Sequence, residues 1–269
     1  MAYWQHGETE IFYEEIGEGT PFLLVHGWAI DHTYLEKALE PIFTSLDKPF
    51  RRIYVDLPGM GASKRGTVRT GEEMMELLYL MMEDLTGGKR FFLGGNSFGA
   101  GVCRAMAAKH REKIRGLMLL VPSAGPSAPT AKMGSYSEKD TAFLKGLTIR
   151  MRAAFSLMNA NLTPASYERF MEQVYPSMMA NADNENLHGI IKGSFSFDID
   201  AAARKDVFAG PVLILTAELD TAVGCTAQKK WLELYPDAKY VLIEGAGHNV
   251  HIDRPEAFFK EVSAWIGNL

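Results

Sequence analysis

Short buried runs of hydrophobic residues alternate along this chain with longer amphipathic stretches. Four of the short runs have the character of a buried strand: Phe22–Val25, Arg52–Val55, Phe91–Leu93 and Ile114–Val121. The stretches Thr33–Thr44 and Gly71–Leu85 lie between them and are predicted to be helices. Such an alternation of strand and helix predicts a parallel sheet that helices cover on both faces.

A half-exposed strand precedes these elements. Residues 10–16 alternate apolar and polar side chains, which is the pattern of a strand with one buried face. Gly17–Pro21 follows with turn-forming residues. We therefore expect an antiparallel hairpin at the entry to the sheet.

The strand pattern stops at Pro122 and resumes only near the end of the chain. Residues 123–205 begin with a loop-rich segment and continue through helical segments rich in Met and Phe, which predicts an inserted helical cap. The later elements are expected at Pro211–Thr216, Gln228–Leu234, Tyr240–Ile243 and, as an amphipathic helix, Pro255–Ile266. The predicted α/β core therefore comprises residues 1–122 and 206–269, with the cap between them.

Composition narrows the range of partners and compartments. The 269 residues are 47% hydrophobic and 23% charged, as in ordinary globular proteins, and the formal net charge of -5 disfavours nucleic acid and anionic membranes. The first residues lack the pattern of a secretory signal, and no apolar run is long enough to span a membrane. Two distant cysteines favour reduced thiols. We expect a cytoplasmic protein with a small-molecule substrate, and a homodimer is compatible with this expectation.

The segment Gly95–Gly99 matches the pattern G-x-S-x-G, and its position makes the match specific. It lies between a predicted buried strand and a helix of small residues, so Ser97 occupies a sharp strand-to-helix turn. Such a turn exposes the serine hydroxyl above the sheet edge, and the flanking glycines remove side chains that would collide there. Ser97 is therefore the predicted nucleophile.

A serine nucleophile needs a base and a carboxylate that orients the base. His248 follows the last predicted strand, at the sheet edge where open α/β sheets carry their chemistry, and is preferred over His251 three residues later. Asp220 follows the strand before it and is the predicted orienting residue, with Glu218 in the same loop as its rival. The remaining histidines are assigned to surface or structural positions: His6, His26, His32, His110 and His188.

The loop His26-Gly27-Trp28 follows the first buried strand and can supply a backbone N–H to a developing oxyanion. Trp28 is the candidate for this donor, and Phe98, which follows the nucleophile, is the candidate for the second. Trp28 can also act as a packing residue, and the two roles are compatible. His26 is predicted to fix the loop by hydrogen bonding.

The segments HGW, DLPGMGAS, GGNSFGA, ELD and GAGHNVHIDRPEAF, in this order, resemble the α/β-hydrolase superfamily, in particular its small capped members. The resemblance implies a mostly parallel eight-stranded sheet with a lid after the sixth strand. It also implies a catalytic triad, assigned here to Ser97, Asp220 and His248. The elbow is similar to that of meta-cleavage-product hydrolases, although HGWAID replaces their glycine-rich loop. Other segments are similar to esterases, perhydrolase-like enzymes and the menaquinone-pathway lyase of this fold.

The predicted function is a serine hydrolase that acts on a small, largely apolar ester or on a carbon–carbon bond, without a cofactor or a metal ion. A non-catalytic small-molecule receptor on the same scaffold is one alternative, because a fold does not dictate a function. A lyase of the menaquinone type is another. Apolar cap residues such as Met151, Phe155 and Phe170 either line the substrate pocket or pack the cap on the core.

Overall fold

The computed structural model describes residues 1–125, 128–182, 184 and 208–269. Its centre is an eight-stranded sheet with the strand order β1-β2-β4-β3-β5-β6-β9-β10. The strands are β1 (Ala2–His6), β2 (Thr9–Ile16), β3 (Thr20–Val25), β4 (Phe50–Val55), β5 (Phe91–Asn96), β6 (Ile114–Leu120), β9 (Val212–Ala217) and β10 (Lys239–Ile243). All neighbours from β4 onward pair in parallel, and β2 pairs antiparallel with both β1 and β4. The predicted fold class is confirmed.

The central strands are apolar along their whole length because helices cover both of their faces. Every residue of β5 and β9 is buried, and in β3 only Thr20 is partly exposed. Strands buried on both sides lack the alternation that marks a half-exposed strand. This is why short uninterrupted runs located these strands in the sequence.

The entry hairpin has a different partner from the one predicted. The expected pairing joined residues 10–16 to the strand after Gly17–Pro21, but β2 instead pairs with β1 through the turn at Gly7 and Glu8. The strand after Gly17–Pro21 is β3, which lies between β4 and β5. The apolar residues of β3 are buried most completely between two parallel neighbours, so β3 takes an inner position and leaves β2 to the edge region.

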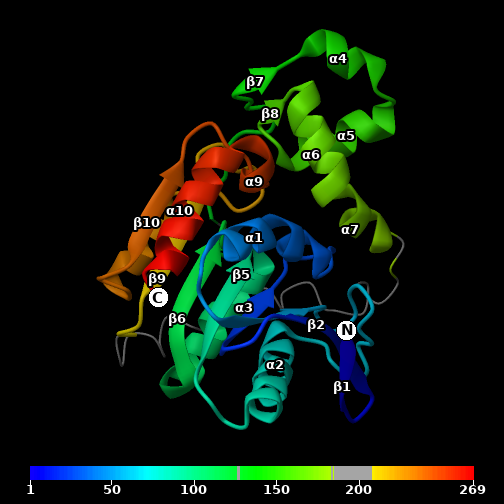
Figure 1. Ribbon diagram of the computed structural model, residues 1–269. Helices are drawn as coiled ribbons and strands as arrows, with labels where there is room; N and C mark the ends of the chain where they lie inside the picture. Colours follow the sequence, from blue (N-terminus) through cyan, green and yellow to red (C-terminus); the bar gives the residue numbers. More distant parts are fainter. Residues whose placement is uncertain (126–127, 183, 185–207) are drawn as a thin grey trace.

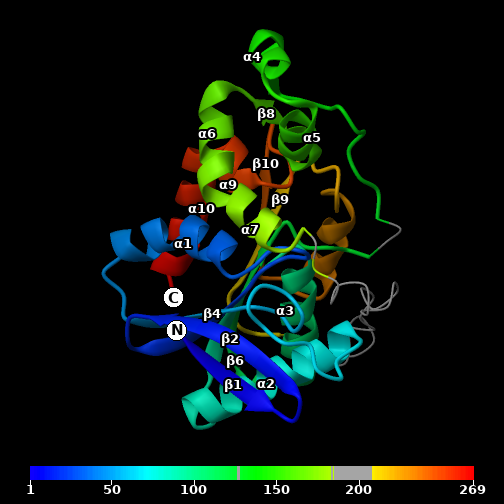
Figure 2. The same cartoon turned by 90° about the vertical axis from the view of Figure 1, so that its right-hand side faces the viewer.

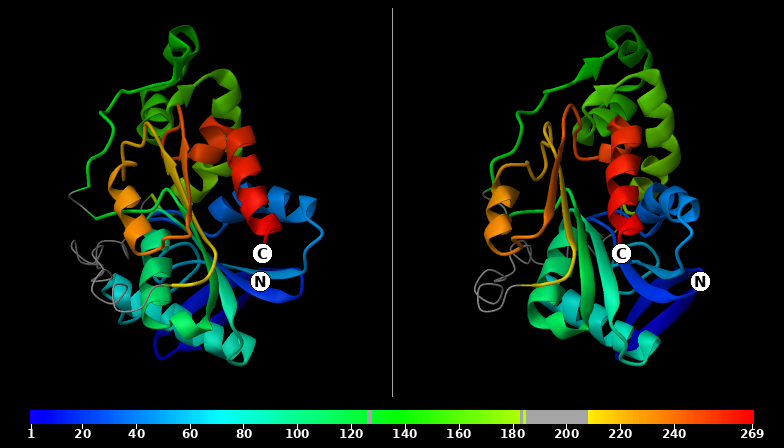
Figure 3. Two further views of the ribbon diagram at one scale, coloured as in Figure 1. Left: turned by 90° about the vertical axis from the view of Figure 1, so that its left-hand side faces the viewer. Right: turned by 60° about the vertical axis from the view of Figure 1, so that its left-hand side comes forward.

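Helices lie on both faces of the sheet. Figure 3 shows α1 and α10 on one face and α2 and α3 on the other. The helices of the core are α1 (Thr33–Ser45), α2 (Gly71–Thr86), α3 (Phe98–Lys109), α9 (Val250–Asp253) and α10 (Pro255–Gly267), with 3-10 helices η1 (Arg111–Lys113) and η3 (Ala227–Glu233). The element expected at Gln228–Leu234 is thus η3. Helix α2 begins where predicted because Thr70 and Glu73 form a reciprocal capping box.

The segment between β6 and β9 contains the elements of the predicted cap. They are β7 (Glu138–Lys139), α4 (Thr141–Gly146), α5 (Ile149–Met158), β8 (Asn161–Leu162), α6 (Pro164–Gln173) and α7 (Tyr175–Ala180). Figures 1 and 2 show them gathered beyond α1 and α9. The parallel pair β7 and β8 was not expected, because two residues per strand are too few to form a pattern. Residues 126–127, 183 and 185–205 of the predicted cap lie outside the described residues, and the domain boundaries stay a prediction.

Two aromatic residues that were candidates for the pocket wall are packed against other aromatic rings of the predicted cap. Phe155 and Phe170 are fully buried, and their ring centroids lie 5.3 Å apart. Both belong to the buried cluster that also contains Leu35 of α1 and Phe258 of α10. Their side chains are therefore enclosed by protein, as expected if these two residues pack the fold.

Candidate active site

Ser97 lies on a sharp turn between β5 and α3, in the strained conformation that the motif predicts. Its backbone angles are φ 53° and ψ -114°, a region that costs a residue with a side chain on the order of 1–3 kcal/mol. The Ser97 N–H donates to the Leu120 carbonyl at the end of β6, at 2.9 Å, and the Ser97 carbonyl accepts from the Ser123 N–H at 3.3 Å. Hydrogen bonds from the Ser97 N–H and to the Ser97 carbonyl thus hold the strained turn. The side chain of Ser97 is only partly buried.

Gly99 allows the start of α3 to approach β3 closely. A Cβ atom at this position would collide with the carbonyl oxygens of Val25 and His26. The absence of a side chain therefore lets the turn at Ser97 come against the loop that follows β3. A Cβ at Gly27, in that loop, would lie 3.3 Å from the Cβ of Ser97.

His248 and Asp220 form a buried pair next to this edge of the sheet. The His248 Nδ1 lies 2.8 Å from the Asp220 Oδ2, and Asp220 is completely buried. The other carboxylate oxygen, Oδ1, accepts the backbone N–H groups of Ala222 and Val223 at 2.8 and 2.9 Å. Because an ionised carboxylate only accepts, Nδ1 carries the proton and Nε2 is left as the basic nitrogen. The loops after β9 and β10 are also joined by the bond from the Leu219 N–H to the Ala246 carbonyl, at 2.9 Å.

The two rival residues have other surroundings. Glu218 is exposed, and its Oε2 accepts the Gly245 N–H at 2.8 Å. His251 is buried with its ring centroid 4.9 Å from that of Tyr34, and its Nε2 has no hydrogen-bond partner. Burial, together with the nearby His248, lowers the pKa of His251 to about 3, so its imidazole is neutral. Among the four residues compared, the structure therefore pairs Asp220 with His248. His188 lies outside the described residues.

The loop after β3 is fixed by His26, as predicted. The His26 Nδ1 lies 2.6 Å from the Gly27 carbonyl oxygen, and its Nε2 accepts the Leu57 N–H at 3.0 Å. Burial lowers the pKa of this ring, which keeps it neutral and able to serve both partners. The rings of Trp28 and Phe98, the predicted oxyanion donors, meet edge to face with centroids 5.5 Å apart. The structure thus brings these two residues together beside Ser97.

Comparison with known proteins places this arrangement in a family. Residues 20–255 match the family model described as the alpha/beta hydrolase fold. The chain belongs to this family. The curated pimeloyl-[acyl-carrier protein] methyl ester esterase of Vibrio campbellii is 23% identical to it over 260 residues, which cover 94% of this chain and 97% of that protein.

Solved structures of alpha/beta hydrolases have the same fold. An alpha/beta superfamily hydrolase from Oenococcus oeni PSU-1 matches with a TM-score of 0.84 at 24% identity, covering 99% of this chain and 98% of that chain. A thermophilic esterase from Thermogutta terrifontis matches with a TM-score of 0.72 at 23% identity, covering 97% and 94%. The predicted superfamily is confirmed, and family membership supports an enzyme of the hydrolase class. Within the described ranges, no helix of this hydrolase is long and apolar enough to cross a membrane.

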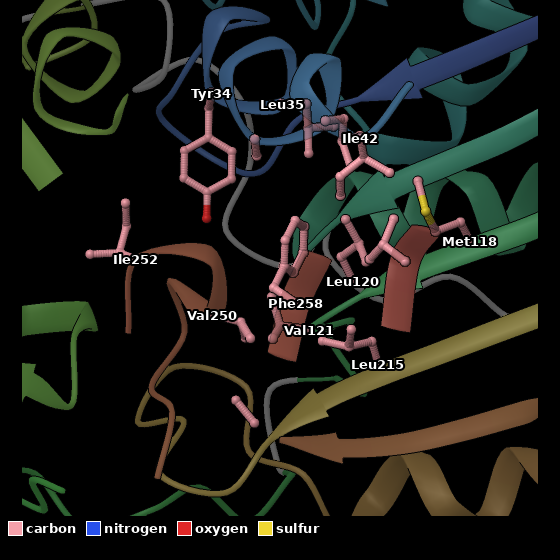
Figure 4. Close-up of a cluster of buried hydrophobic side chains, with 14 of the residues drawn as sticks. Tyr34, Leu35, Ile42, Met118, Leu120, Val121, Leu215, Val250, Ile252 and Phe258 are labelled. Atoms are coloured by element: carbon pink, nitrogen blue, oxygen red, sulfur yellow. The ribbon is translucent and has the colours of Figure 1, made fainter. Parts of the chain in front are cut away.

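A small cavity in this alpha/beta hydrolase lies against His248 and against the strand end that precedes Ser97. Asn96, the residue before Ser97, lines it together with His248 and Tyr34. Figure 4 shows the apolar surroundings, with Tyr34 from α1, Leu215 from β9 and neighbouring side chains of the buried cluster. The hydroxyl of Ser97 makes no hydrogen bond to His248 in the part of the chain that the structure describes. Their predicted relation as nucleophile and base therefore rests on their position at the same edge of the sheet.

Sequence reasoning missed a second carboxylate–imidazole pair near the same edge, between Asp56 and the partly buried His32. The Asp56 Oδ1 lies 2.8 Å from the His32 Nδ1, and its Oδ2 accepts the Ala62 N–H at 2.8 Å. Burial alone would lower the pKa of His32, but the Asp56 carboxylate outweighs it and raises that pKa. His32, Glu14 and Glu36 also place possible metal-ligand atoms within 4.8 Å of one another. Within this group, the His32 Nε2 lies 3.7 Å from the Glu14 Oε2.

Proposed function

We propose that this alpha/beta hydrolase is a serine esterase that cleaves small, largely apolar carboxylic esters through an acyl-enzyme at Ser97. The observation that carries the proposal is the buried Asp220–His248 pair beside a serine held at φ 53°. Buried carboxylate–imidazole pairs are the usual means of preparing a base for a serine hydroxyl. The full-length similarity to a curated methyl ester esterase supports an ester as the substrate class.

The proposed reaction has two halves that use the same groups. The His248 Nε2 takes the Ser97 proton as the serine oxygen attacks the ester carbonyl, and then gives that proton to the leaving alcohol. Water next attacks the acyl-enzyme, with His248 first accepting and then returning a proton, which releases the acid and restores Ser97. The backbone N–H groups of Trp28 and Phe98 are the proposed donors to the oxyanion in both halves. All proposed steps use groups of this chain and water.

The proposed role of Asp220 follows from its two bonded oxygens. The bonds from Ala222 and Val223 fix the carboxylate, and the carboxylate fixes the imidazole with its proton on Nδ1. When His248 becomes positively charged during the reaction, the neighbouring negative charge stabilises it. Asp220 therefore orients the base and takes no proton itself.

A substrate panel tests the proposed activity. Wild type and Ser97→Ala are assayed with p-nitrophenyl esters of two to eight acyl carbons, a dicarboxylic acid monomethyl ester and a meta-cleavage dienoate. Ser123→Ala is the matched control, because Ser123 lies near Ser97 and is also partly buried. We expect wild type and Ser123→Ala to hydrolyse short esters, and Ser97→Ala to lose this activity.

Isotope labelling separates the competing functions. Hydrolysis in H₂¹⁸O should place one ¹⁸O atom in the acid product. Turnover of the dienoate alone would identify a carbon–carbon bond hydrolase, and product formation without ¹⁸O would identify a lyase. Tight binding of esters without turnover would identify a receptor, and each of these three results would overturn the esterase proposal.

A further inference from the structure

Asp253, at the end of α9, joins the loop of His248 to the cap. Its Oδ2 accepts two backbone N–H groups at 2.7 Å each, one from Gly247 and one from Ala160. Its Oδ1 accepts the Asn161 N–H at 3.1 Å. Ala160 and Asn161 belong to the segment between α5 and α6, so one carboxylate holds two separate parts of the chain.

The residues on both sides of His248 are bound to the same cap segment. Gly247 is bound through Asp253, and the Asn249 N–H donates directly to the Met158 carbonyl at 3.2 Å. A Cβ atom at Gly247 would lie 2.8 Å from that carbonyl oxygen, which shows how closely the two segments approach. On the core side, the Tyr34 hydroxyl of α1 donates to the Asn249 Oδ1 at 3.0 Å.

We infer that Asp253 is a positioning residue for the base: by binding Gly247 and the cap segment 160–161 together, it sets where His248 stands relative to Ser97. The inference rests on the proposed function, in which His248 is the base. Asp253 contacts the backbone before His248 and acts through it. The cap is thereby coupled to the catalytic loop through a side chain of the core.

The energetics of Asp253 are consistent with a role in positioning. It is 2% exposed, and burial raises its pKa to about 6 although three N–H groups donate to the carboxylate. The raised pKa means that the ionised form is less stable in the fold than in water, so near neutral pH the charge lowers the stability of the protein. A neutral residue of the same shape would relieve that cost. The presence of a carboxylate at position 253 is explained by the three N–H groups that it accepts and by the geometry that these bonds impose.

Substitution by Asn and by Ala tests the inference. In Asp253→Asn one oxygen remains to accept N–H groups while the amide NH₂ opposes another, and in Asp253→Ala every acceptor is lost. We expect kcat for a p-nitrophenyl ester to fall about 10-fold in Asp253→Asn and about 100-fold in Asp253→Ala, the scale of a misplaced catalytic group. KM should stay close to the wild-type value. The thermal midpoint should fall less in Asp253→Asn, which keeps one acceptor oxygen, than in Asp253→Ala, which keeps none.

Arg169→Met is the matched control, because Arg169 of α6 joins the cap to α9 without touching Gly247. Its guanidinium donates to the Ile252 carbonyl at 3.0 and 2.8 Å. If cap attachment alone matters, Arg169→Met will lower kcat as much as Asp253→Asn, and the inference is wrong. The inference is also wrong if Asp253→Asn keeps the wild-type kcat or raises only KM. If Asp253→Ala does not fold, the result for Asp253→Asn alone decides the test. Ser97→Ala and His248→Ala run in parallel: a kcat close to that of wild type in either variant would overturn the proposed function itself.

Discussion

Each carboxylate oxygen of Asp220 has its own task, and substitution by Asn separates the two. Oδ1 accepts two backbone N–H groups, and Oδ2 accepts the proton on the Nδ1 of His248. In Asp220→Asn the amide oxygen can keep the backbone bonds while the NH₂ group faces Nδ1. Nδ1 must then act as an acceptor, which moves the imidazole proton to Nε2. The nitrogen that should take the Ser97 proton is thereby already protonated.

The expected loss of activity from Asp220→Asn is large, and the expected loss of stability is small. A wrong imidazole tautomer lowers kcat by about 10⁴-fold, or about 5.4 kcal/mol at 1.36 kcal/mol per tenfold change. The bonds to Ala222 and Val223 persist in this variant. In Asp220→Ala both N–H groups lose their acceptor, at about 1–3 kcal/mol for each one that is buried. Only Asp220→Ala should therefore combine lost activity with clear destabilisation.

Two assays on the same preparations check this expectation. Steady-state hydrolysis of p-nitrophenyl butyrate gives kcat, and urea unfolding followed by circular dichroism gives the free energy of unfolding. Glu218→Gln is the control, because Glu218 lies in the same loop and accepts a backbone N–H from Gly245. The reasoning is refuted if Asp220→Asn keeps kcat within tenfold of wild type. It is equally refuted if Glu218→Gln is the more damaging variant, which would transfer the orienting role to Glu218.

Further predictions concern the histidines and the cap. His248→Ala should lower kcat for an ester by about 10⁴–10⁶-fold, at least as much as Asp220→Asn, whereas His251→Ala should affect mainly stability; equal losses of kcat in the two histidine variants would contradict the assignment of the base. Burial lowers the pKa of His251 from 6.5 to about 3, so its neutral form stabilises the fold above pH 6.5 and this contribution is lost as the pH falls toward 3. Urea unfolding at pH 7 and at pH 5 measures how much the free energy of unfolding falls between the two pH values. This fall should be about 2 kcal/mol smaller in His251→Phe than in wild type, and an identical fall in both proteins would disprove the argument. Phe155→Ala removes a buried ring in contact with Tyr167 and Phe170 and should lower the free energy of unfolding by about 3–5 kcal/mol, so an unchanged urea midpoint would be inconsistent with the packing described.

The sequence was most informative where burial is complete on both sides of a strand. The runs that became β3, β5 and β9 contain almost only apolar residues because helices cover both faces. Their order with the intervening helices was enough to predict a parallel sheet. The same order located Ser97, since a glycine-flanked serine after such a run has few other structural explanations.

Pairing partners were harder to predict than strands. Residues 10–16 were expected to pair with the strand that follows Gly17–Pro21, but β4 lies between β2 and β3 in the sheet. Alternation along β2 indicates one buried face and carries no information on which neighbour accepts its hydrogen bonds. The short strands β7 and β8 had no pattern at all, because two residues per strand are too few to show alternation.

Within the site, geometry added what residue order does not contain. Asp220 and Glu218 occupy one loop, and only the folded chain directs one carboxylate to His248 and the other to Gly245. Asp253 carried no signal in the sequence beyond its place before a helix-starting proline. Its role depends on Gly247 and on residues 160–161, which are distant in sequence and meet only in the fold.

The central claim, that Ser97 is an activated nucleophile, is tested most directly by covalent labelling. Wild type, Ser97→Ala and Ser123→Ala are treated with a fluorophosphonate and examined by intact-protein mass spectrometry and peptide mapping. We expect one adduct per chain, located on Ser97, in wild type and Ser123→Ala, and none in Ser97→Ala. An adduct on another serine, or equal labelling of Ser97→Ala, would contradict the assignment of Ser97 as the nucleophile.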